Sequence, residues 1–215
     1  MPTLTLSTSD MERRLAYALS IAFQPLFVPL YTVLLMLGTG SYLSFAVQGT
    51  LRWVLLFIIT INTILLPMLV FAWFVKRKII SSYHMAERNE RHLPFLVGIT
   101  FLISTYILLG KLPLPGMFRA LVLTSVASLV VTALINMWWK ISVHMMGMGG
   151  MLGSVVAMAM MYQVPVMPMA IALAFAAGLV GWSRLCLDAH TPAQVYSGFT
   201  LGLVLTIVCL GVLIG

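Results

Sequence analysis

The amino-acid sequence predicts an all-α protein that forms a polytopic bundle of six or seven transmembrane helices. Two observations carry this prediction. Of the 215 residues, 61% are hydrophobic and only 8% are charged, whereas soluble domains have roughly 45–50% apolar and 25% charged residues. The apolar residues also fall into runs of about the 17–20 residues that a helix needs to cross a bilayer. We therefore expect one integral membrane domain over residues 1–215.

Seven apolar runs follow one another along the chain. Pro94 favours the start of the third, because proline fits the first turn of a helix. The fifth is short enough to be a tilted or re-entrant piece, so six spans remain an alternative to seven. The expected helices are 15–37, 51–75, 94–109, 118–139, 149–163, 167–182 and 193–214.

The charged residues lie in short segments between the apolar runs. Lys and Arg number 12 against 5 Asp and Glu, a net charge of +7. This spread argues against nucleic acid as a partner and favours membrane lipids or an anionic substrate. The methionines between Met145 and Met169 are more typical of an adaptable core than of a copper conduit, since no Cys or His ladder accompanies them. We predict no metal site, and the oligomeric state stays open.

With seven spans, three polar segments would share one face of the membrane: Lys76–His92, Lys140–Gly147 and Ser183–Thr191. The first is the longest and is expected to be an interfacial helix or a structured loop. By the positive-inside rule, the excess of Lys and Arg on this face weakly favours the cytoplasmic side of a bacterial inner membrane. Cations that hold a ligand are not topology signals, so the side stays open.

These polar segments contain the residue types that phosphoryl transfer to a histidine requires. The reaction needs an unprotonated imidazole, cations for the phosphate oxygens and an acid for the leaving group. Arg184 and, six residues later, His190 lie in one such segment, and the run Thr191–Gln194 follows directly. A lipid phosphate site is therefore a candidate function.

The segment Ser183–Gly198 resembles the third signature of the type 2 phosphatidic acid phosphatase (PAP2) family. The resemblance implies that His190 is the nucleophile and becomes a phospho-histidine. It also implies that Arg184 and Ser183 bind the phosphate, Arg184 with the bidentate geometry that a lysine lacks.

A second segment, Lys140-Ile141-Ser142-Val143-His144, keeps the Ser and His spacing of the second PAP2 signature. The resemblance implies a phosphate contact for Ser142 and a general-acid role for His144. Lys140 adds a cation that this signature lacks. The following glycines, from Gly147 to Gly153, would allow close approach of a ligand or of a neighbouring helix.

The first PAP2 signature, a Lys followed by an Arg-Pro pair, is matched only in part. His84 stands seven residues before Arg91, where the family has the Lys. Arg88 and Arg91 are three residues apart and would share a face of a helix. We expect these two arginines to bind phosphate in place of the family's pair.

Gln194 is the main departure from the family, which has an Asp four residues after the nucleophilic His. That Asp accepts a hydrogen bond from the imidazole and stabilises its positive charge. A Gln carbonyl can accept the bond without bringing charge, or the amide can present its NH₂ group instead. Asp188, two residues before His190, is a candidate substitute.

The resemblance covers about residues 80–215 and leaves residues 1–75 as two accessory or leading spans. It implies hydrolysis of a lipid phosphomonoester or a polyprenyl diphosphate through phospho-His190, without metal or cofactor. Two alternatives remain. One is a catalytically impaired relative that binds or transports anionic lipids, and the other is a phosphotransferase that passes the phosphoryl group to another hydroxyl.

Overall fold

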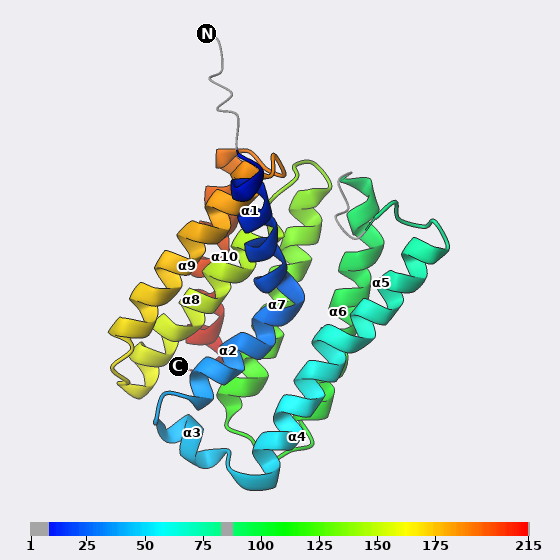
Figure 1. Cartoon of the computed structure of the whole chain (residues 1–215). Coiled ribbons are helices and arrows are strands. Elements are labelled where there is room, and N and C mark those ends of the chain that lie inside the picture. Colours follow the sequence, from blue (N-terminus) through cyan, green and yellow to red (C-terminus); the bar gives the residue numbers. More distant parts are fainter. Residues whose placement is uncertain (1–8, 83–87, 215) are drawn as a thin grey trace.

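The computed structural model describes residues 9–82 and 88–214 of the chain. Within these residues every regular element is a helix (Figure 1), so the expected all-α bundle is confirmed. Seven helical spans in this part of the chain are long and apolar enough to cross a membrane, the higher of the two expected numbers. They are Asp10–Leu37, Gly49–Lys76, Asn89–Leu109, Gly116–Asn136, Val143–Tyr162, Met167–Cys186 and Pro192–Ile214.

The first three spans are composite and the last four are single helices. The first contains α1 (Asp10–Ala22), the 3-10 turn η1 (Pro25–Phe27) and α2 (Val28–Leu37); the second contains α4 (Gly49–Thr60), the π turn η2 (Ile61–Leu65) and α5 (Leu66–Lys76). A short helix, α3 (Tyr42–Ala46), connects them, and the third span contains the 3-10 turn η3 (Asn89–Arg91) and α6 (His92–Leu109). The others are α7 (Gly116–Asn136), α8 (Val143–Tyr162), α9 (Met167–Cys186) and α10 (Pro192–Ile214).

Proline accounts for the interruptions in the first two spans. Pro25 has no N–H to continue a helical hydrogen-bond pattern, and α1 ends three residues before it, at Ala22. In the second span, Pro67 cannot donate to the carbonyl of Thr63, and the preceding turn widens into η2. The Thr63 hydroxyl instead donates to the carbonyl of Leu26 at 3.3 Å, which ties the second span to the first.

Glycines bring α8 and α10 into close contact. A Cβ at Gly202 would overlap the carbonyl oxygen of Met146, and one at Gly149 would overlap that of Phe199. A Cβ at Gly198 would lie 2.7 Å from the carbonyl oxygen of Ser142. Small residues permit such an approach of two helices. The glycines therefore serve helix packing along this crossing.

Several predicted boundaries are wrong. The fifth helix begins at Val143 rather than at 149, because its glycines, which are poor helix formers, are the residues that contact α10. The third span begins at Asn89, so Pro94 lies inside the helix near its first turn. The fourth ends at Asn136 rather than at 139. Part of the polar stretch Lys76–His92, namely residues 83–87 with His84, lies outside the described residues.

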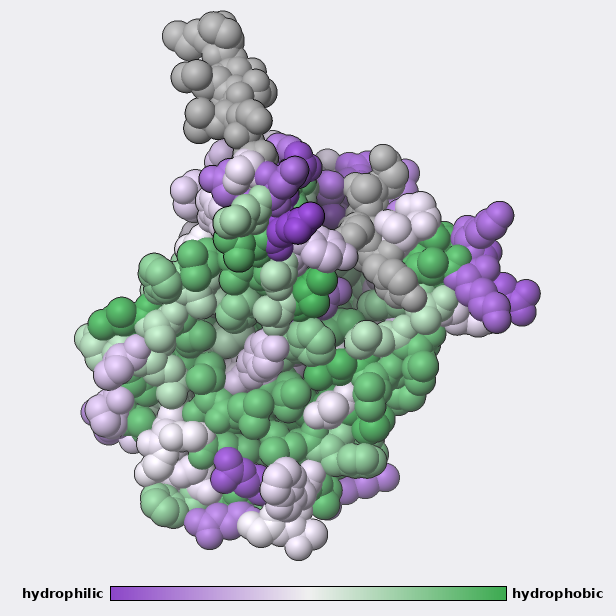
Figure 2. Space-filling model, viewed as in Figure 1, coloured by the Kyte–Doolittle hydropathy of each residue, from purple (hydrophilic) through white to green (hydrophobic). Residues whose placement is uncertain are grey.

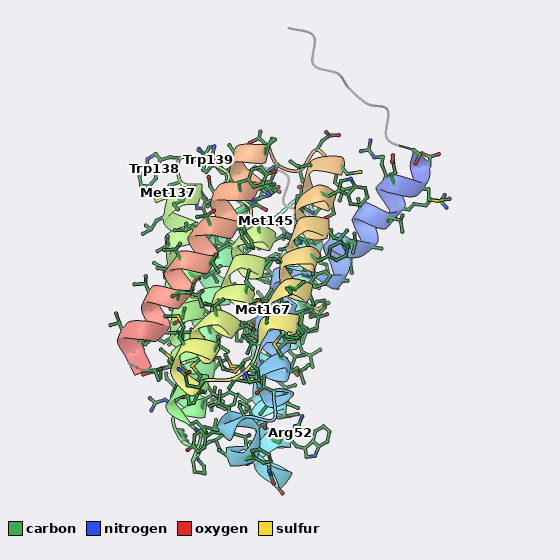
Figure 3. All side chains as sticks on the ribbon, turned by 90° about the vertical axis from the view of Figure 1, so that its left-hand side faces the viewer. Arg52, Met137, Trp138, Trp139, Met145 and Met167 are labelled. Atoms are coloured by element: carbon green, nitrogen blue, oxygen red, sulfur yellow. The ribbon has the colours of Figure 1, made fainter. Side chains whose placement is uncertain are left out.

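The outer surface matches a membrane environment. Figure 2 shows a hydrophobic band around the middle of the bundle with hydrophilic residues at both ends. Met137, Trp138 and Trp139 lie at one end and Arg52 at the other (Figure 3). Trp and Tyr are enriched where a bilayer meets water. The chain is thus an integral membrane protein.

Candidate functional site

The polar segments predicted to share one face do meet at one end of the bundle. This is the upper end in Figure 1, where the α7–α8 and α9–α10 connections lie close to the start of α1. The side chains of Arg91, Lys140 and Arg184 lie near enough to His190 for their charges to act on it. Two spans and two connections therefore contribute to one cationic site: Arg91 and Arg184 lie in spans, and Lys140 and His190 lie in connections.

The turn between α9 and α10 positions His190. α9 ends at Cys186, and Asp188 adopts a left-handed conformation, with φ of 51°. The N–H of Ala189 returns to the carbonyl of Arg184 at 3.1 Å, and α10 begins at Pro192. This tight turn leaves His190 only 8% exposed.

Gln194 orients the imidazole of His190. Its Oε1 lies 3.1 Å from Nδ1 of His190 and accepts a hydrogen bond from the N–H of Thr191, also at 3.1 Å. Because a backbone N–H can only donate, the amide must present its oxygen here. Nδ1 of His190 then carries the proton, and Nε2 is the basic nitrogen of the neutral ring. The Gln194 carbonyl thus holds the tautomer that a nucleophilic histidine needs.

Gln194 also has a structural role. The Thr191 hydroxyl lies 3.4 Å from the N–H of Gln194, while the Gln194 side chain accepts from the N–H of Thr191. This reciprocal pair is a capping box at the start of α10. One side chain therefore caps a helix and orients His190.

The environment keeps His190 neutral. Its pKa is lowered from 6.5 to about 4. Burial is the largest cause, and the charge of Arg91 comes next; the charges of Arg184 and Lys140 act in the same direction, while the hydrogen bond with Gln194 opposes them. At neutral pH the ring is unprotonated and available to attack an electrophile.

Two buried hydrogen-bond donors of the site have no partner within residues 9–82 and 88–214: the Ser142 hydroxyl and Nε of Arg184. Ser142 is fully buried and occupies the N-cap position of α8 without a side-chain capping bond; its N–H lies 3.4 Å from the carbonyl of Gln194. Buried polar groups are nearly always paired. An anion with several oxygen atoms is a ligand that could pair with both.

His144 lies in the first turn of α8 and contacts a residue that sequence reasoning missed. Its Nε2 lies 3.1 Å from the carbonyl oxygen and 3.4 Å from the hydroxyl of Ser20 in α1. Nη1 of Arg184 donates to the same hydroxyl. The only sequence signal was a single serine in an apolar run, one turn before the Gln24-Pro25 break.

Arg91 and Arg88 differ in their surroundings. Arg91 is 8% exposed and is the charge with the largest effect on His190. Arg88 is half-buried, and its carbonyl accepts a hydrogen bond from the Asn136 amide at 3.1 Å. No hydrogen bond or ion pair joins its guanidinium to another described residue. Asn136 therefore anchors the segment that carries Arg91, and Arg88 contributes its backbone.

Two other expected residues have different roles. Ser183 is fully buried and its hydroxyl donates to the carbonyl of Val180 at 2.8 Å, so this donor is already used within α9. Asp188 is exposed and serves the turn, so it does not substitute for the family's Asp. We leave both out of the site.

A cavity of about 140 Å³ lies inside the bundle, and Val143, between Ser142 and His144, forms part of its wall. The hydroxyls of Thr132 and Ser154 in the wall donate to backbone carbonyls, whereas the buried hydroxyl of Thr124 has no partner among the described residues. Its wall also includes Leu26, Gly98, Leu102, Ser128 and Thr206. A mainly apolar space therefore lies between the helices and reaches Val143, the neighbour of Ser142 and His144 in the chain.

In the described part of the chain, no three side chains of His, Cys, Asp or Glu are grouped closely enough to bind a metal ion. No protein-family model matches the chain, and no curated protein or solved structure matches it.

Proposed function

We propose that this protein is a PAP2-type lipid phosphate phosphatase that works through a phospho-histidine. One observation carries the proposal: His190 is neutral, its Nδ1 proton is held by Gln194, and it lies beside cations and unpaired buried donors. A phosphate monoester has the charge and the oxygen atoms that such a site would bind.

The reaction has two steps. Nε2 of His190 attacks phosphorus, and the bond from phosphorus to the lipid oxygen breaks. His144 acts as an imidazolium with a proton on each ring nitrogen; it gives its Nδ1 proton to the departing alkoxide and becomes neutral. The positive charges of Arg184, Arg91 and Lys140 balance the charge of the phosphate oxygens, and the Ser142 hydroxyl donates a hydrogen bond to one of them. Water then gives a proton to Nδ1 of His144 and attacks phospho-His190, which breaks the bond from phosphorus to Nε2, releases inorganic phosphate and restores the free imidazole.

The substrate is proposed to be a lipid because of the adjoining cavity. A phosphate bound between Ser142 and His190 would have its ester oxygen near Val143, where the cavity begins. Hydrocarbon chains gain free energy from an apolar enclosure. The cations of the site also fit the anionic head-group region of a bilayer. We propose a bacterial inner membrane, with a weak preference for the cytoplasmic side from the Lys and Arg residues of this face that lie outside the site.

A second candidate is a protein that binds or transports anionic lipids without hydrolysing them. The neutral side chain of Gln194 favours this alternative, because its carbonyl accepts a hydrogen bond from His190 but brings no negative charge to stabilise an imidazolium. In the serine-protease example of this orienting role, an Asp-to-Asn change lowers kcat about 10⁴-fold.

Phosphate release by purified protein tests the proposal. The panel contains phosphatidic acid, phosphatidylglycerol phosphate, phosphatidylinositol phosphate and undecaprenyl diphosphate. His190→Ala is expected to abolish release, and His92→Ala, a change of an exposed histidine outside the site, is expected to leave it intact. With a ³²P-labelled substrate, the wild-type protein is expected to acquire an acid-labile covalent ³²P label. The absence of this label in His190→Ala would support the covalent step. Equal background release by wild type and His190→Ala on every substrate would overturn the enzyme and favour lipid binding.

A further inference from the structure

The first helix supplies a group that none of the three PAP2-like segments contains. Ser20 lies in the last turn of α1, in a span that the sequence resemblance leaves as accessory, and it is 8% exposed. It contacts two site residues from other helices, Arg184 on α9 and His144 on α8. We propose that Ser20 is a positioning residue of the phosphate site.

The carbonyl of Ser20 is available because α1 ends early. Gln24, four residues on, directs its N–H to the carbonyl of Ile21 at 3.1 Å, and Pro25 follows. The last carbonyls of a helix have no partner within it. Nε2 of His144 lies 3.1 Å from this carbonyl oxygen. Since a carbonyl only accepts, Nε2 carries a proton and Nδ1 is the nitrogen left to exchange a proton with a leaving group.

The hydroxyl of Ser20 holds Arg184. Other buried hydroxyls of the bundle, such as those of Thr105 and Thr132, donate to carbonyls of their own helices. The Ser20 hydroxyl instead accepts from Nη1 of Arg184, whose buried Nε has no partner among the described residues. This contact fixes the guanidinium and leaves its Nε–H available for an anion.

Small side chains allow this arrangement. Ala16 and Ser20, one turn apart, are the buried residues of α1, and α1 packs against α9. The C-terminal end of a helix carries partial negative charge. Here that end faces the positive charge of Arg184. The end of α1 therefore holds the Arg184 guanidinium in place, and the guanidinium in turn stabilises the packing of α1 against α9.

The test compares Ser20→Ala, which keeps the carbonyl and removes the hydroxyl, with Ser20→Thr, which keeps both. Thr105→Ala, another loss of a buried hydroxyl, is the matched control. The inference rests on the proposed function, so two probes are used with the full chain: binding of inorganic phosphate by calorimetry, and hydrolysis of dioctanoyl phosphatidic acid.

Ser20→Ala is expected to weaken phosphate binding and raise KM, each roughly 10-fold, as for one lost hydrogen bond to a charged group. Ser20→Thr should keep phosphate binding and KM near their wild-type values, and Thr105→Ala should change neither quantity.

Hydrolysis and phosphate binding that are the same in Ser20→Ala and Thr105→Ala would overturn the role of Ser20 and leave the phosphatase intact. Phosphate binding that depends on Ser20 without any hydrolysis would support Ser20 and reject the phosphatase. A wild-type protein that shows neither binding nor hydrolysis would overturn both.

Discussion

At the scale of single residues, Gln194 is the position at which the proposed phosphatase and the alternative lipid-binding protein make different predictions. Its carbonyl fixes the proton on Nδ1 of His190 and its side chain caps α10. A glutamate at this position has the same reach, so it can keep both contacts while adding a negative charge beside the imidazole.

Gln194→Glu is expected to raise kcat by roughly 10-fold or more, because a carboxylate stabilises the positive charge that His190 gains during attack. The pKa of His190 should also rise from about 4, since a nearby negative charge favours the protonated ring. Activity of the wild type is lost as pH falls through this pKa, and the acid limb of the variant should lie at higher pH. A pH profile of kcat/KM measures the shift.

Gln163→Glu is the control for this change of charge. Gln163 is exposed at the far end of α8, where its amide donates to the carbonyl of Met160. Its profile should match that of the wild type. An unchanged kcat and an unmoved acid limb in Gln194→Glu would argue against Gln194 as the orienting group.

At the scale of single helices, the glycine contact between α8 and α10 sets the geometry of the site. It holds Ser142 and His144, at the start of α8, next to His190 and Gln194, around the start of α10. A side chain at the crossing would push the two starts apart.

Gly202→Ala is therefore expected to lower the free energy of unfolding by about 1–3 kcal/mol, the usual cost of overpacking, and to lower phosphate release. Gly211 lies on the same helix, and a Cβ added there meets nothing within 4 Å. Gly211→Ala should therefore leave the free energy of unfolding unchanged or raise it slightly. Thermal unfolding of the two variants in the same detergent compares them. Equal unfolding midpoints would contradict the close contact.

The sequence predicts some parts of this arrangement better than others. Hydropathy located all seven spans, because crossing a bilayer requires long apolar runs. Arg184 and His190 could be found since they lie in one short motif. Ser20 could not be found in this way, because its contacts depend on how α1 packs against helices that are far away in the sequence. The start of α8 at Val143 was not predicted, because glycines are poor helix formers and, in a sequence, the glycines that pack against α10 resemble loop residues.

For the whole molecule, the central question is how a lipid substrate would lie across several spans. The cavity brings together residues from every span except the sixth, including Leu26, Asn62, Leu102, Ser128 and Thr206. Its position beside Val143 suggests that the hydrocarbon chain lies within the bundle while the phosphate stays at its end.

Ser128→Leu, which fills part of this cavity, is expected to raise KM for long-chain phosphatidic acid roughly 10-fold, equivalent to about two buried CH₂ groups at ~0.8 kcal/mol each. The short-chain dioctanoyl lipid should be affected much less. Thr100→Leu, an equally apolar change on the exposed face of α6, is the control. A similar loss for both chain lengths would place the hydrocarbon elsewhere.

The pairing of α8 with α10 also has a consequence for biosynthesis. A ribosome makes a chain from its N-terminus, and α9 must be inserted before α10 is complete. Until α10 arrives, the glycine face of α8 has no partner, and Ser142 and His144 have neither His190 nor Gln194 beside them. The nascent protein therefore stays inert in the membrane, and the proposed activity begins only when its last helix docks.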